Sequence, residues 1–156
     1  MRTAAEAAGI IAILISLVLL AIEINQSNKI AQASIEYDIL SNYNEYNRQV
    51  LADPELADFV ARLKIADDVA LSPGDQVRAH SFVTIFLNIW VAVHTAHENG
   101  QLTDDSYQAY LEDVRSKVLT YPGAVPYFRE SVQTSPSVRQ FEIFQPIFEA
   151  SDALAQ

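Results

Sequence analysis

The sequence predicts an all-α protein in which an N-terminal transmembrane helix continues into a soluble multi-helix bundle. Three observations support this prediction. A long apolar run lies near the start of the chain, apolar residues further on recur at spacings of three and four, and no sustained alternation typical of strands occurs. The 156 residues provide room for a terminal segment and one compact domain. We therefore expect a transmembrane anchor at residues 1–25 and an acidic helical bundle at residues 26–156.

The apolar run extends from Ala7 to Ile22, and Ser16 is its one polar side chain. As a helix, these sixteen residues measure about 24 Å, which is short of a hydrocarbon core of about 30 Å. Flanking residues from Arg2 to Asn25 close that gap. We expect residues 7–24 to contact the lipid bilayer.

The energetics of insertion depend on where the flanking charges lie. Eleven Ile, Leu or Val residues between Ile10 and Ile24 favour insertion by roughly 3–7 kcal/mol in total. This gain can offset the carboxylates of Glu6 and Glu23 when both lie at the ends of the span, but not at its centre. The sequence therefore permits a single membrane span.

Two other interpretations compete with the anchor. A secretion signal would explain Arg2 followed by an apolar run, and residues 31–33 (Ala-Gln-Ala) match a cleavage pattern, but this pattern lies nine residues beyond the run. A buried helix of a soluble core should show a polar stripe, and residues 7–22 show none. The few flanking charges, Arg2 before the span and Lys29 after it, favour neither orientation.

The anchor helix is expected to continue into the soluble part, because no glycine or proline occurs between Gly9 and Pro54. Apolar residues at helical spacing predict a tyrosine-rich face that either packs on the following helices or binds a partner. This face comprises Ile35, Ile39, Leu40, Tyr43, Tyr46, Val50 and Leu51.

The next two helices begin with capping residues. Asp53 before Pro54 predicts the first N-cap, with Glu55 in the first turn. Its buried side is expected to hold Leu56, Phe59, Val60 and Leu63. Ser72, followed by Pro73 and Asp75, predicts the second N-cap.

The helix that follows Ser72 is expected to end at Gly100 in the left-handed conformation. Between Phe82 and Val93 it is interrupted only by Thr84 and Asn88. Twelve residues are too few to cross a bilayer, so we expect the central helix of the bundle, with Asn88 hydrogen-bonded inside it.

The remaining chain predicts one longer helix and several short ones. Thr103 is the expected N-cap, and Leu102 and Tyr107 are placed for a hydrophobic staple. The inward face should hold Tyr107, Leu111, Val114 and Val118. The last helices should break at Pro122-Gly123 and at Pro136, with a kink at Pro146.

The cluster with ligand-like spacing is His94, His97 and Glu98, which share one helix face. Its order, H-x-x-H-E, differs from the zinc protease motifs, and His80 is about 21 Å away along the helix. The alternatives are a metal or cofactor site and two imidazoles that cap free carbonyls at the helix end.

The acidic pairs predict solvated charge rather than catalysis. Asp104-Asp105 should lie in a first turn, Glu112-Asp113 on an outward face and Asp67-Asp68 in a loop. With no cysteine, no nucleophile motif and no phosphate-binding glycine loop, we expect no enzyme, no catalytic residue and no cofactor. A net charge of −10 opposes binding to nucleic acid.

The chain resembles a group of small bacterial single-pass membrane proteins of uncharacterised function. The segments that carry the likeness are ISLVLLAIEINQSNKIAQAS, DPELA, ENGQL and PGAVPYF. The resemblance implies a helical domain tethered to the bacterial inner membrane, on the cytoplasmic side. We expect an interaction protein or an accessory subunit of a membrane complex, with a protein partner or a second copy of itself. Metal or cofactor binding through His94, His97 and Glu98 is the alternative function.

Overall fold

The fold is all-α, as predicted. The structure is a computed structural model that describes residues 2–65 and 71–154. Within these ranges it contains seven α-helices, two short 3-10 helices and no strand. The helices are α1 (Arg2–Ala52), α2 (Pro54–Ile65), α3 (Pro73–Glu98), α4 (Asp104–Thr120), α5 (Val125–Gln133), α6 (Pro136–Arg139) and α7 (Gln145–Leu154), and the 3-10 helices are η1 (Pro122–Ala124) and η2 (Glu142–Phe144).

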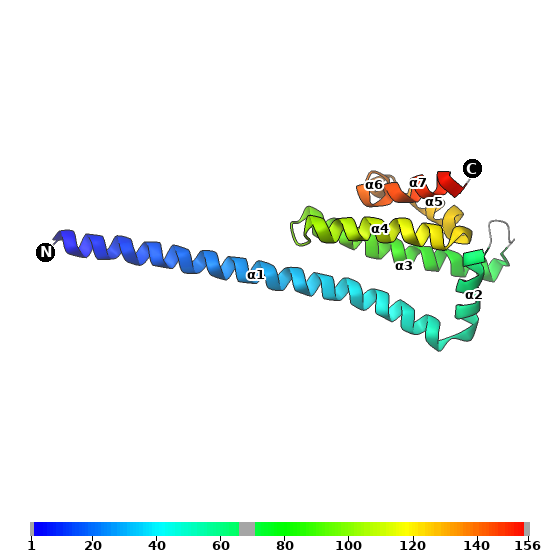
Figure 1. The fold of residues 1–156 in the computed structure, drawn as a ribbon, viewed down its shortest axis with the longest axis horizontal. Helices are drawn as coiled ribbons and strands as arrows, with labels where there is room; N and C mark the ends of the chain where they lie inside the picture. Colours follow the sequence, from blue (N-terminus) through cyan, green and yellow to red (C-terminus); the bar gives the residue numbers. More distant parts are fainter. Residues whose placement is uncertain (1, 66–70, 155–156) are drawn as a thin grey trace.

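Helix α1 runs without a break for 51 residues, and its N-terminal half projects away from all other helices (Figure 1). All eleven Ile, Leu and Val side chains between Ile10 and Ile24 are exposed, by 49–62%. The hydroxyl of Ser16 donates a hydrogen bond of 2.9 Å to the carbonyl of Ala12, so it is satisfied within the helix. By length and composition, this helix could span a membrane.

The second half of α1 packs against the bundle through one face. Ile39 and Tyr46 are buried, and Tyr43 is partly buried, as predicted for the tyrosine-rich face. The prediction was wrong for Leu40 and Leu51, which are 54% and 86% exposed. Each of these leucines directly follows a residue of the packed face, and one residue turns the side chain by about 100° around the helix.

Every proline of the chain lies at the first or second residue of a helix, where a missing N–H costs no hydrogen bond. Pro146 is the second residue of α7, so the kink expected there is absent and the residue instead helps to begin a new helix. The first positions are held by Pro54, Pro73, Pro122 and Pro136, and the second positions by Pro126 and Pro146.

The predicted caps are confirmed. Asp53 Oδ1 accepts a hydrogen bond of 2.9 Å from the backbone N–H of Glu55. Ser72 Oγ accepts a hydrogen bond of 3.2 Å from the backbone N–H of Asp75, and Thr103 Oγ1 accepts one of 3.2 Å from the backbone N–H of Ser106.

Gly100 has φ 68° and ends α3 in the left-handed conformation. Its N–H donates to the carbonyl of His97 at 2.8 Å, and the N–H of Gln101 donates to that of Ala96 at 2.8 Å. These two bonds form a Schellman motif.

Helix α3 is the central helix of the bundle. In its most apolar stretch 44% of the residues are buried, against 0% in the most apolar stretch of α1, so neighbouring helices cover this part of α3. Asn88 is exposed, which contradicts the expected hydrogen bond inside the bundle. It lies one turn after Thr84, whose hydroxyl bonds back to the carbonyl of His80 at 2.7 Å, and both residues lie on the side of α3 that faces solvent.

The C-terminal helices complete the core. The predicted inward face of α4 is confirmed, because Tyr107, Val114 and Val118 are buried and Leu111 is partly buried. Helix α7 packs along α4 and buries Ile147. Asp104 and Asp105 lie in the first turn of α4, as expected. The loop predicted at residues 67–68 lies outside the described residues.

Candidate functional site

The residues of the expected ligand cluster do not converge on one point. His94 Nδ1 lies 3.1 Å from the hydroxyl of Tyr107, and His97 Nε2 lies 2.9 Å from Asp104 Oδ1. Glu98 is exposed. Within residues 2–65 and 71–154, no group of three or more His, Asp or Glu side chains is placed to hold a metal ion.

The two imidazoles pack on aromatic rings instead. His97 stacks on Tyr107 with ring centroids 4.0 Å apart, and His94 stacks on Phe141 at 4.2 Å. Burial, with smaller contributions from the charges of Glu142 and Glu98, raises the pKa of Tyr107 to about 12. These contacts join the end of α3 to the start of α4 and to the residue before η2.

A partly buried polar cluster instead links α1, α3 and α4. Tyr43 donates a hydrogen bond of 2.6 Å from its hydroxyl to Asp113 Oδ2. The indole N–H of Trp90 lies 3.0 Å from the Tyr43 hydroxyl and 3.4 Å from Asp113 Oδ2, so it donates to both oxygens. We call Tyr43, Trp90 and Asp113 the junction cluster.

The surroundings of Tyr43 keep its hydroxyl protonated. Burial raises the pKa of Tyr43 far above its ordinary value, and the hydrogen bond and charge of Asp113 raise it further. Tyr43 therefore stays a neutral donor. Lys117 Nζ lies 4.0 Å from Asp113 Oδ1 and 5.6 Å from the ring centroid of Phe86, so a cation accompanies the carboxylate.

The structure corrects the expectation that Asp113 lies on an outward face. Glu112 does point outward, with its side chain 71% exposed, whereas the side chain of Asp113 is 31% exposed and faces α1. A second stripe on α4 would have indicated this, because residues 106, 110, 113 and 117 recur at helical spacing beside the apolar face. That stripe comprises Ser106, Tyr110, Asp113 and Lys117.

Two further polar contacts join α1 to the bundle on the N-terminal side of the junction cluster. The hydroxyl of Ser106 donates to Glu36 Oε1 at 3.0 Å. Gln32 Nε2 donates at 3.4 Å to the carbonyl of Gly100, which lies in the turn that joins α3 to α4. Together with Tyr43 and Asp113, these bonds fix the rotation of α1 relative to the bundle.

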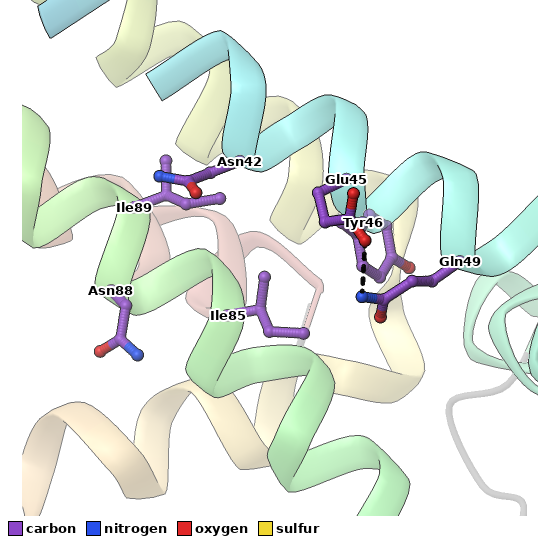
Figure 2. A pocket seen from close by; sticks show the side chains of 7 residues that line it. All are labelled: Asn42, Glu45, Tyr46, Gln49, Ile85, Asn88 and Ile89. Atoms are coloured by element: carbon purple, nitrogen blue, oxygen red, sulfur yellow. Dashed lines mark hydrogen bonds between the residues drawn. The ribbon is translucent and has the colours of Figure 1, made fainter. Parts of the chain in front are cut away.

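An elongated groove runs between α1 and α3 on one side of the junction. One cavity of about 300 Å³ lies beside Tyr46, and another of about 360 Å³ lies beside Ile39. Figure 2 shows the first cavity. Gln49 Nε2 donates a hydrogen bond of 3.2 Å to Glu45 Oε1 one turn earlier on α1, and Asn88 points away from α1. Both cavities include Asn42 in their lining, so they form one surface feature.

The aromatic residues beneath this groove hold α1 on α3. Tyr46 contacts Phe86 and Phe82 with ring centroids 5.2 and 5.8 Å apart, and Tyr43 contacts Phe86 at 5.9 Å. The hydroxyl of Tyr46 is buried without a hydrogen-bond partner, and burial raises its pKa. These contacts supply packing and orientation rather than chemistry.

Comparisons with known protein families, curated protein sequences and solved structures give no match to this chain. The resemblance to small bacterial membrane proteins therefore stays a prediction. The class that the structure defines is a helical bundle with a long N-terminal helix whose first half is apolar and unpacked.

Proposed function

We propose that the chain is a membrane-anchored interaction protein, an accessory or structural subunit, whose α1 spans a bilayer and holds an acidic bundle beside it. The observation that carries the proposal is the unpacked apolar half of α1. Eleven large aliphatic side chains, each about half exposed or more, would face water if this segment were not in lipid. A contiguous apolar surface of this size marks a membrane or protein contact.

The position of the bundle supports the same function. Gln32, the first side chain that bonds to the bundle, lies eight positions after Ile24. At about 1.5 Å per residue, the turn between α3 and α4 lies about 12 Å beyond the span, just outside the lipid headgroups. Because α1 has no break and is bonded to the bundle, it would hold the bundle at a fixed height and orientation.

We place the anchor in a bacterial inner membrane, with the bundle in the cytoplasm, on the basis of the sequence resemblance. The acidic bundle suits this position, because anionic headgroups repel it and leave its outer surface open to a protein partner. The groove between α1 and α3 is one such open surface.

The test of anchoring is alkaline extraction of membranes that contain the full chain. Wild-type protein should stay in the membrane pellet. The double variant Leu14→Arg, Leu17→Arg should be released, because two central arginines cost about 5–7 kcal/mol, which offsets the apolar gain. The control Gln26→Arg, Asn28→Arg adds the same charge outside the span and should stay in the pellet. Release of the wild type, or retention of the first variant, overturns the proposal.

A further inference from the structure

Helix α1 carries a second apolar stripe that nothing in the described chain covers. After Ile24 it has four exposed large apolar side chains, namely Ile30 (71%), Tyr37 (71%), Leu40 (54%) and Leu51 (86%). All four fall on a single heptad pattern, with spacings of seven, three and eleven residues. The intervening positions of this pattern are Ala33, Asn44 and Asn47, which are exposed as well. We call residues 30, 33, 37, 40, 44, 47 and 51 the outer seam.

The outer seam lies away from the bundle. Helix α1 meets the bundle through Ile39, Tyr43 and Tyr46, and at about 100° per residue this face is roughly 130° from the outer seam. Figure 1 shows α3 to α7 on one side of α1, with the opposite side unoccupied along its length. The rotation of α1 is fixed by Tyr43 and Asp113, so the outer seam stays outward.

We propose that the outer seam pairs with the same seam of a second copy, so that two α1 helices form a parallel, left-handed coiled coil above the membrane. A heptad repeat of apolar residues gives this geometry. The inference rests on the proposed anchoring, because a bilayer holds every copy in the same orientation and at the same depth. Each seam then meets its own copy in register, as a two-fold axis requires.

The polar residues of the seam favour two strands in register. Asn44 takes the first core position of its heptad, in line with Ile30, Tyr37 and Leu51, and a single asparagine there selects a two-stranded parallel pair. In that register Asn44 faces Asn44 of the partner, and their side-chain amides can bond to each other. The alternative, a heterologous helix, would need its own polar residue at the same height.

The charges beside the outer seam permit self-pairing even though the chain carries −10. The flanking positions hold Lys29, Glu36 and Arg48. Glu36 is bonded to Ser106, and Arg48 pairs with Glu45 on its own helix. The seam is therefore close to neutral, while a two-fold axis places the two acidic bundles on opposite sides of the helix pair.

The same heptad continues into the proposed span. Gly9, Ala12 and Ser16 lie three heptads before Ile30, Ala33 and Tyr37, and small residues let membrane helices approach closely. Glu23 and Gln26 interrupt the pattern where the span ends, at the level of hydrated headgroups. From Gly9 to Leu51 the seam measures about 65 Å by about 10 Å, so pairing would bury about 1,300 Å² in total, which is within the range of stable interfaces.

The test is disulfide crosslinking of single-cysteine variants of the full chain in native membranes. The chain has no cysteine, so each variant reports one position. Asn44→Cys and Asn42→Cys form a matched pair, because both replace an exposed asparagine on α1, but Asn44 lies in the outer seam and Asn42 on the opposite side of the helix. A disulfide requires Cα atoms closer than about 7 Å, so we expect about ten-fold or more dimer at position 44 than at position 42.

A scan across positions 37 to 44 should give maxima at Tyr37, Leu40 and Asn44 and minima at Asp38 and Asn42. Dilution with empty lipid should leave the pattern unchanged. Crosslinking without this periodicity, or crosslinking of Asn44→Cys only to another protein, overturns the pairing. If the protein stays in the membrane pellet but no seam position forms a crosslink, the pairing proposal is wrong and the anchoring proposal stands. If the protein is soluble, the anchoring proposal is wrong, and the same cysteine scan still tests pairing.

Discussion

The hydroxyl of Tyr43 on α1 donates a 2.6 Å hydrogen bond to the carboxylate of Asp113 on α4, seventy positions further along the chain. Trp90 of α3 donates to both partners, so three helices meet in one partly buried polar cluster. The cluster lies where the projecting helix joins the bundle. It fixes which face of α1 is packed and which remains outward.

Removing one partner of this bond should destabilise the docking of α1. Tyr43→Phe and Asp113→Asn should each lower the free energy of unfolding by about 1–2 kcal/mol, because the first removes a hydrogen bond to a carboxylate and the second replaces that carboxylate by a neutral, weaker acceptor. The double variant should cost about 1 kcal/mol less than the sum, because the two residues share one interaction. Denaturant unfolding of the full chain in detergent micelles, followed by fluorescence of the single tryptophan, measures all three.

The neighbouring residue Glu112 provides the control for the Tyr43 and Asp113 variants. Glu112→Gln removes the same charge one residue earlier, where the side chain pairs with Arg115 at the surface. Its effect should stay within about 0.5 kcal/mol. Equal losses for Asp113→Asn and Glu112→Gln, or strict additivity of Tyr43→Phe with Asp113→Asn, would show that the junction cluster does not hold α1.

Stability should fall at alkaline pH. In the unfolded chain a tyrosine ionises near about pH 10, whereas in the folded chain burial raises the pKa of Tyr107 to about 12. Between these values the unfolded state binds fewer protons than the native state, so the free energy of unfolding decreases as pH rises. Burial and Asp113 raise the pKa of Tyr43 as well, which adds to the decrease.

Tyr107→Phe isolates one part of this pH dependence. Between about pH 10 and about pH 12 the free energy of unfolding of the variant should fall less steeply with pH than that of the wild type. The difference in slope should correspond to at most one proton per molecule. Unfolding midpoints measured at a series of pH values give the two slopes. Identical slopes for the wild type and the variant would contradict a raised pKa at Tyr107.

Two glycines at opposite ends of α3, Gly74 in its first turn and Gly100 just after its last residue, should respond to alanine in opposite directions. Gly100→Ala should cost about 1–2 kcal/mol, because Gly100 has φ 68° and an L-residue is strained there. Gly74→Ala should stabilise by about 0.4–1 kcal/mol, because it reduces the freedom of the unfolded chain and its Cβ would meet only Ser72 Oγ, at 3.9 Å. Thermal unfolding of both variants checks the signs, and a stabilising Gly100→Ala would rule out the left-handed helix end.

Local chemistry made the helix ends predictable from the sequence. Asp53, Ser72 and Thr103 cap helices because their side chains reach backbone N–H groups two or three residues ahead, and this depends on no distant contact. Gly100 and the prolines act through their own backbone freedom or restriction in the same way. The lengths of α1, α3 and α4 followed from these signals.

Whether an individual side chain points into the core or toward solvent was less predictable, because this depends on how each helix is rotated against its neighbours. Asp113 was expected outward and Asn88 inward, and the structure reverses both. The sequence also did not show to which of two apolar stripes on α1 Leu40 belongs, and only one of these stripes packs on the bundle. The spacing of Ser106, Tyr110, Asp113 and Lys117 is the one sequence signal that pointed to the junction cluster.

Thiol labelling of single-cysteine variants in opened proteoliposomes tests membrane anchoring most directly. A membrane-impermeant maleimide should react with Lys29→Cys and Ser41→Cys but not with Ile15→Cys or Leu19→Cys, because the last two positions lie in the hydrocarbon core. All four should react after the protein is denatured. Equal labelling of all four variants in these proteoliposomes, before denaturation, would contradict a membrane-spanning α1.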